Sequence, residues 1–136
     1  MTQIIKLKTS LFIAAMLALP VAQAATMAKA DYKAGKERIS AEYKTDKAAC
    51  DALSGNAKDV CVQEAKGKEK VAKAELEYSY TGKAKDQAKV QKAKAESTYE
   101  VAKEKCDDQA GNGKDVCVKE AKAAKAKALA DAQGKS

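Results

Sequence analysis

The chain has 136 residues, of which 26 are lysine or arginine and 19 are aspartate or glutamate, so its formal net charge is +7. Histidine and tryptophan are absent, and the carboxylates alternate with lysines as on solvated helix faces. This composition argues against an enzyme, and we expect no catalytic residue and no cofactor.

Residues 1–24 have the pattern of a secretory signal peptide. Two lysines form its charged start, and the apolar run Leu11–Ala22 is short for a membrane span. The small residues Ala22 and Ala24 mark a cleavage site after Ala24. An uncleaved membrane anchor is the alternative. Cleavage would remove two lysines and no acid, so the net charge would fall from +7 to +5. We expect a periplasmic chain without an integral membrane span.

A repeat organises the rest of the chain. The stretches Cys50–Lys66 and Cys106–Lys122 are identical at 12 of 17 positions, at an offset of 56 residues. Each holds two cysteines around a Gly-Asn pair, so we expect two helical hairpins, residues 25–81 and 82–136. Four cysteines allow three pairings. We predict the local disulfides Cys50–Cys61 and Cys106–Cys117, because export favours oxidation and each closes a short loop.

The Gly-Asn pair predicts a helix end followed by a helix start. Glycine suits the left-handed residue after a helix, asparagine is a strong N-cap, and an acidic side chain three residues later favours the helix dipole. The predicted capping residues are Gly55, Asn56 and Asp59 in the first repeat and Gly111, Asn112 and Asp115 in the second.

The expected helices span residues 27–53, 57–80, 83–108 and 114–132. The first has one apolar face with Tyr32, Ile39 and Tyr43, which the third repeats largely in alanine. Gly82 leaves two arrangements open. It could end the second helix and allow a four-helix bundle, or the helix could run through it as one rod of about fifty residues. We favour the extended form, because the apolar stripes are thin.

Other interpretations of the charged and sulfur-bearing residues are weaker. The cysteines lack the close pairs of zinc sites and redox motifs, and the aspartates at the hairpin tips lack the alternating register of a calcium loop, so no metal is expected. Nucleic acid is not expected as a partner, because the basic residues are lysines apart from Arg38. The alternative function is ligand binding, either of an anionic envelope polymer or lipid headgroup or of a metal ion, which would require free thiols in place of the disulfides.

Three tyrosines near the junction of the repeats, Tyr78, Tyr80 and Tyr99, are the candidate contact patch for a partner protein. Thin alanine stripes on the helices would also allow a homodimer. A holdase-type chaperone that uses the tyrosine patch is a further alternative.

The lysine-alanine-glutamate runs, as in KGKEKVAKAELE and AKVQKAKAE, resemble the helical stalk of the envelope protein TolA. The chain is more similar to the small exported proteobacterial proteins labelled "TolA-like". This resemblance implies a Gram-negative periplasm and a helical fold. We therefore expect a non-enzymatic structural or interaction protein of the cell envelope.

Overall fold

The computed structural model describes residues 27–133, and this part of the chain is all α-helical, as predicted. Its elements are α1 (Lys29–Ala49), the short 3₁₀ turn η1 (Cys50–Ala52), α2 (Gly55–Thr81), α3 (Ala84–Cys106) and α4 (Asn112–Gln133). The first helix ends before its predicted limit at Leu53, because its last residues tighten into η1. The predicted signal peptide lies outside the described residues.

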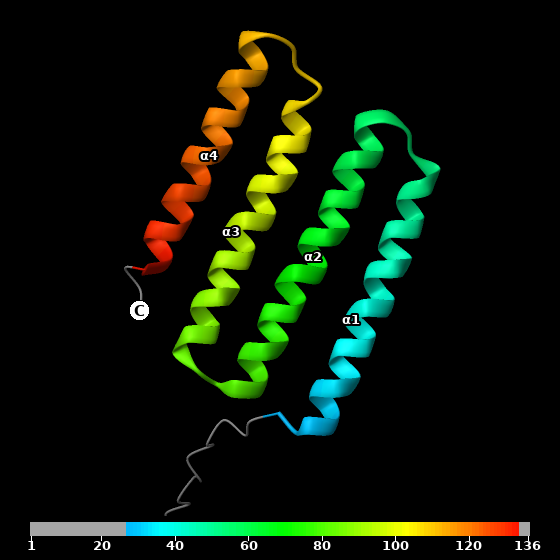
Figure 1. The fold of residues 1–136 in the computed structure, drawn as a ribbon, viewed down its shortest axis with the longest axis vertical. Coiled ribbons are helices and arrows are strands. Elements are labelled where there is room, and N and C mark those ends of the chain that lie inside the picture. The colour runs from blue at the N-terminus through cyan, green and yellow to red at the C-terminus, as the bar shows by residue number, and fades with distance from the viewer. Residues whose placement is uncertain (1–26, 134–136) are drawn as a thin grey trace, which may run out of the picture.

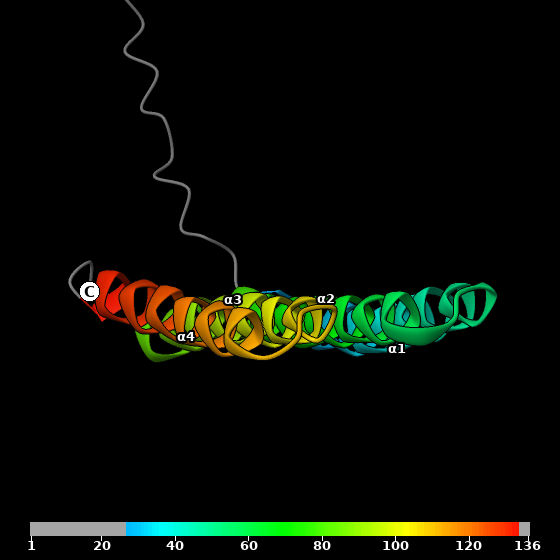
Figure 2. The same cartoon turned by 90° about the horizontal axis from the view of Figure 1, so that it is seen from above.

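The four helices lie side by side in one flat layer and run alternately up and down (Figure 1; Figure 2 shows the layer from above). Each helix packs on its neighbour in the chain, and within residues 27–133 α1 makes no contact with α4. The array is therefore open rather than closed into a bundle. Both disulfide-bearing hairpin tips lie at one end of the layer, and the α2–α3 turn lies at the other.

The favoured prediction of one helix running through Gly82 is wrong. Gly82 has a left-handed conformation with φ of 63°, and its N–H donates to the carbonyl oxygen of Tyr78 at 2.8 Å. Glycine adopts this conformation without a Cβ penalty, so it ends α2 and lets α3 turn back. Because α3 turns back, α2 packs on α1 on one side and on α3 on the other.

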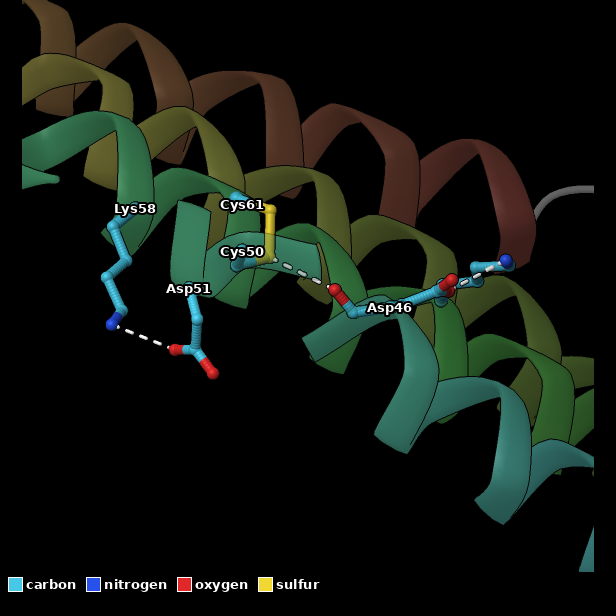
Figure 3. Close-up of a disulfide and its surroundings, with 6 residues drawn as sticks. Asp46, Cys50, Asp51, Lys58 and Cys61 are labelled. Carbon is cyan, nitrogen blue, oxygen red and sulfur yellow. Dashed lines mark hydrogen bonds and ion pairs between the residues drawn. A yellow bond between two sulfur atoms is a disulfide. The ribbon is translucent and has the colours of Figure 1, made fainter. Parts of the chain in front are cut away.

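Both predicted disulfides are confirmed. Cys50 pairs with Cys61 and Cys106 pairs with Cys117, each with a Cα–Cα distance of 5.7 Å (Figure 3 shows the first). Cys50 and Cys106 are fully buried. Each bond joins the last turn before a hairpin tip to the helix that follows it, so the two bonds fasten the two hairpins in the same way.

The same ion pair brackets each hairpin tip. Lys58 Nζ lies 2.9 Å from Asp51 Oδ1, as Figure 3 shows, and Lys114 Nζ lies 2.9 Å from Asp107 Oδ1. The hydrogen bond from Lys58 lowers the pKa of Asp51. Because these side chains are largely exposed, each pair contributes little to stability.

The helix starts at the tips differ from the prediction. Gly55 and Gly111 have left-handed φ values of 57° and 55°, but α2 already begins at Gly55 and α4 at Asn112. The N–H of Asp115 donates to the carbonyl oxygen of Gly111 at 3.4 Å, so the helical hydrogen bonds begin at the glycine. Both asparagines therefore lie in the first helical turn and not at the N-cap.

The side chains of the predicted caps have different surroundings. Asp115 lies in the first turn of α4, whereas Asp59 lies just beyond the first turn of α2. Ser54, which precedes α2, makes no side-chain hydrogen bond to it. The Nδ2 atom of Asn56 is buried and has no hydrogen-bond partner among residues 27–133. At the first tip, α2 therefore begins at the left-handed Gly55 without the predicted side-chain cap.

The core is thin and lies in the three seams between neighbouring helices. Its buried apolar residues are small, apart from three branched side chains and the cysteines: Ile39, Cys50, Ala65, Leu76, Val90, Ala93, Ala95, Cys106 and Ala121. Alanine forms helix readily but buries little surface. The helices must therefore approach closely, and the disulfides must supply part of the stability.

Candidate functional site

A groove opens between α3 and α4 at the end of the second hairpin that lies away from its disulfide. Its volume is about 630 Å³, within the range of ligand pockets. Four alanines and three polar residues line it: Ala84, Ala88, Ala128, Ala132, Gln87, Gln91 and Asp131. A smaller hollow of about 210 Å³ continues along the same seam and shares Gln91 and Ala128 with the groove.

The first hairpin fills the corresponding space with its own side chains. At the repeat offset of 56 residues, Ala88 corresponds to Tyr32 and Ala132 corresponds to Leu76. Both larger side chains lie in the seam between α1 and α2, where Leu76 is buried. The groove therefore exists because hairpin α3–α4 carries alanine at positions where hairpin α1–α2 carries large apolar residues.

Aromatic stacking closes the first hairpin at this end. The rings of Tyr32 and Tyr80 stack with their centroids 4.4 Å apart. The Tyr32 hydroxyl donates to Glu77 Oε2 at 2.5 Å, and this hydrogen bond raises the pKa of Tyr32 above its ordinary value. The ammonium group of Lys36 lies 5.6 Å from the centre of the Tyr32 ring. The two rings and the carboxylate thus occupy the end of the first seam, whereas the described residues of the second hairpin leave the corresponding space open.

A glycine makes room for Leu76 in the same seam. A Cβ added to Gly35 would lie 2.7 Å from Leu76 Cδ1, which is closer than carbon atoms pack. The repeat counterpart of Gly35 is Gln91, which lines the groove opposite Ala132. The first hairpin thus packs the large side chain of Leu76 on Gly35. At the same positions the second hairpin has the methyl group of Ala132 and the polar side chain of Gln91.

The structure distributes the three tyrosines of the predicted contact patch over different places. Tyr80 stacks on Tyr32 of α1, whereas Tyr99 lines the smaller hollow between α3 and α4, with the ammonium group of Lys125 at 4.9 Å from its ring centre. Tyr78 is half-buried on α2. Tyr80 and Tyr99 thus belong to opposite seams, α1–α2 and α3–α4, and the structure does not gather them into one cluster.

The groove can offer both apolar contact and hydrogen bonds. Its alanine methyl groups give an apolar floor, and the amides of Gln87 and Gln91 can donate and accept. At the rim, Lys127 Nζ donates to Asp131 Oδ2 at 2.8 Å, and this hydrogen bond raises the pKa of Lys127. Such a lining suits an apolar or aromatic group that carries a polar edge.

A buried carboxylate lies beside the α2–α3 turn. Asp86 is only 2% exposed and accepts hydrogen bonds from the Thr81 hydroxyl at 2.6 Å and from Lys89 Nζ at 2.7 Å. These two donors, Lys89 first, hold the pKa of Asp86 below its usual value. Because both donors lie within five residues of Asp86, the cluster fastens the turn between the two hairpins.

The cysteines of residues 27–133 are used as disulfides and not as metal ligands. All four cysteines are disulfide-bonded, so none is free to bind zinc as a thiolate. Within residues 27–133, no group of three or more cysteine and acidic side chains is placed to hold a metal ion. In the same range, no helix is both long enough and apolar enough to cross a membrane.

No family model, curated protein or solved structure matches the chain.

Proposed function

We propose that this protein is a non-enzymatic interaction protein of the Gram-negative periplasm, and that the groove between α3 and α4 is its docking site. The partner would be an envelope protein that inserts one or two apolar or aromatic side chains. The observation that carries this proposal is the contrast between the two hairpins, because among residues 27–133 the same space is filled in α1–α2 and open in α3–α4.

The first hairpin indicates what the groove would accept. Its corresponding space holds a leucine and stacked tyrosine rings, one of which donates a hydrogen bond to a carboxylate. A partner segment with an aromatic residue next to a branched aliphatic residue could make equivalent contacts with the alanine floor. Buried aromatic side chains are also the residues that dominate binding energy at protein interfaces.

The compartment is inferred from the disulfides and from the sequence. Two disulfides point to an oxidising environment outside the cytoplasm. The signal-peptide pattern of residues 1–24 and the TolA-like composition favour the periplasm as that environment.

The decisive experiment fills the groove with the residues of the first hairpin. The double substitution Ala88→Tyr and Ala132→Leu should remove the docking site, because the larger side chains would occupy space that is open. Gln91 stands where Gly35 makes room for Leu76 in the first hairpin, so the purified variant is first checked for the circular dichroism and thermal unfolding of the parent. A control variant, Ala57→Tyr, adds a ring at an exposed position on α2.

Binding can be measured in two ways. A photo-crosslinking residue at Gln87, expressed with the natural signal peptide, should give a discrete adduct that the double substitution abolishes and Ala57→Tyr retains. The fluorescent apolar probe anilinonaphthalene sulfonate should bind the purified protein and lose that binding in the double variant. Adducts and probe binding that the filled groove leaves unchanged would refute the proposal.

A further inference from the structure

The seam between α2 and α3 has a simple register. Gly67 of α2 faces Ser97 of α3 so closely that an added Cβ would overlap the serine hydroxyl. One turn further along each antiparallel helix, helix geometry places Val71 opposite Ala93, which is buried. This seam joins the end of one repeat to the start of the next, so it shows how one hairpin packs on another.

The two outer edges of the layer carry the repeat counterparts of these residues. At the offset of 56, the counterparts of Gly67 and Val71 are Ala123 and Lys127 on α4. The counterparts of Ser97 and Ala93 are Ala41 and Glu37 on α1. All four are exposed, because no hairpin follows α4 or precedes α1 in the described chain.

The edges are complementary in size and in charge. Placed in the α2–α3 register, Ala123 would face Ala41, so two small side chains would meet at the closest approach. Lys127 would face Glu37, so a pair of opposite charges would stand where Val71 and Ala93 form an apolar pair. The ion pair between Lys94 and Glu75, 2.7 Å apart in the α2–α3 seam, has Arg38 and Asp131 as its counterparts.

An exposed apolar side chain fits the same register. Val116 on α4 is 53% exposed, whereas its counterpart Val60 on α2 is partly covered. Two turns along the seam from Gly67 and Ser97, helix geometry places Val60 on the side of α2 that faces Glu104, which accepts a hydrogen bond from Gln63 of α2. In the corresponding position, Val116 would face Ala48 at the end of α1 and lose contact with water. The α4 edge thus presents an exposed apolar side chain that a neighbouring helix would cover, as α3 covers α2.

We propose that the protein self-associates head to tail, with α4 of one copy packed antiparallel on α1 of the next as α2 packs on α3 within one chain. The interface is heterologous, so it adds copies in one direction and extends the flat layer. It uses the outer edges of α1 and α4. Lys127 and Asp131, which pair with each other at the rim of the groove, lie on the α4 edge as well, whereas Ala41 and Ala123 do not line the groove.

The test blocks one edge at a time. Ala41→Arg places a bulky charge on the α1 edge, and Ala123→Arg does so on the α4 edge. Both positions are exposed, so both variants should keep the circular dichroism and thermal unfolding of the parent. In sedimentation velocity from micromolar to millimolar concentration, the parent should form oligomers that grow with concentration, and each variant alone should remain a monomer.

The mixture of the two variants is the diagnostic sample. Each retains the edge that the other has lost, so an equimolar mixture should form a dimer and nothing larger. A parent that stays monomeric throughout, or a symmetric dimer that only one of the two substitutions disrupts, would overturn the proposal.

A charge exchange tests the register itself. Glu37→Lys or Lys127→Glu alone would place like charges opposite each other and should weaken self-association about tenfold. The two substitutions combined in one chain restore opposite charges and should recover most of the parent affinity. If the double variant is as weak as the single variants, the register is wrong.

Discussion

Gly67 of α2 faces Ser97 of α3 at a close approach between the two hairpins. A Cβ on residue 67 would overlap the serine hydroxyl and lie 3.1 Å from the serine Cβ. We expect Gly67→Ala to lower the free energy of unfolding by about 1–2 kcal/mol, because overpacking outweighs the gain in helix propensity. Urea unfolding followed by circular dichroism measures the change.

The partner residue supplies the control for this prediction. Ser97→Ala removes the hydroxyl and should have a small effect alone. Combined with Gly67→Ala, it should recover part of the lost stability, because the closest overlap is gone. A Gly67→Ala protein as stable as the parent would show that the two helices can separate at this seam without cost.

The two disulfides should differ in importance, although they have the same geometry. Each closes an 11-residue separation, for which loop-entropy arguments give roughly 2–3 kcal/mol. The seam between α1 and α2 also contains Ile39 and Leu76, whereas the seam between α3 and α4 is mainly alanine. Replacing Cys106 and Cys117 by alanine should therefore free α4 more than the matching change at the first tip frees α1.

Hydrogen exchange measured by mass spectrometry would resolve this difference helix by helix. We expect the amides of α4 to exchange rapidly in the Cys106→Ala/Cys117→Ala protein while α1 and α2 stay protected. The Cys50→Ala/Cys61→Ala protein should show a smaller change in α1. Equal loss of protection in both proteins would contradict the role assigned to the apolar side chains of the first seam.

Most of the fold was predictable because the repeat marks its own boundaries. The cysteine pairs and the glycines at each tip indicated two stapled hairpins. The direction of the chain at Gly82 was not predictable, because thin apolar stripes are compatible with a rod as well as with packed helices. The close approach at Gly67 decides between them, and a glycine within a helical pattern does not show from sequence alone which side chain it faces.

Only one of the two replacements that open the groove was recognised from the sequence. The replacement of Tyr32 by Ala88 in the second repeat was evident, and it indicated a thinner seam. The matching loss of Leu76 at Ala132 completes the opening, but its effect depends on how far α4 extends beside α3. The tyrosine patch was the competing site, and it does not form as one surface because Tyr80 stacks within the first hairpin.

Leu76 should be the most sensitive apolar position of the first hairpin. It is 8% exposed and packs against Gly35, so Leu76→Ala would remove buried methyl groups and leave a cavity. We expect a loss of about 2–4 kcal/mol in the free energy of unfolding. Leu129→Ala on α4, where the leucine is only half-buried, is the matched control and should cost clearly less. Similar losses at the two sites would show that the seams are equally packed.

The buried carboxylate of Asp86 gives the protein an acid-sensitive turn. Lys89 and Thr81 lower the pKa of Asp86, so the folded state binds its proton less tightly than the unfolded state does. Its contribution to stability is therefore present above the unfolded value of about 3.9 and is lost as the pH falls through the lower folded value. Asp86→Asn should remove this contribution, so parent and variant should differ in stability at neutral pH and converge in strong acid.

Urea unfolding between pH 2 and neutral pH, with pH steps of about one unit around the unfolded pKa, would test this convergence. Asp59→Asn, which removes the same charge at an exposed position on α2, serves as the control for the loss of one negative charge. If the difference between the parent and Asp86→Asn stays constant down to the lowest pH, the carboxylate does not stabilise the turn through its charge. If the two proteins are equally stable at every pH, the hydrogen bond from Thr81, which an asparagine side chain can also accept, is the interaction of residue 86 that fastens the turn.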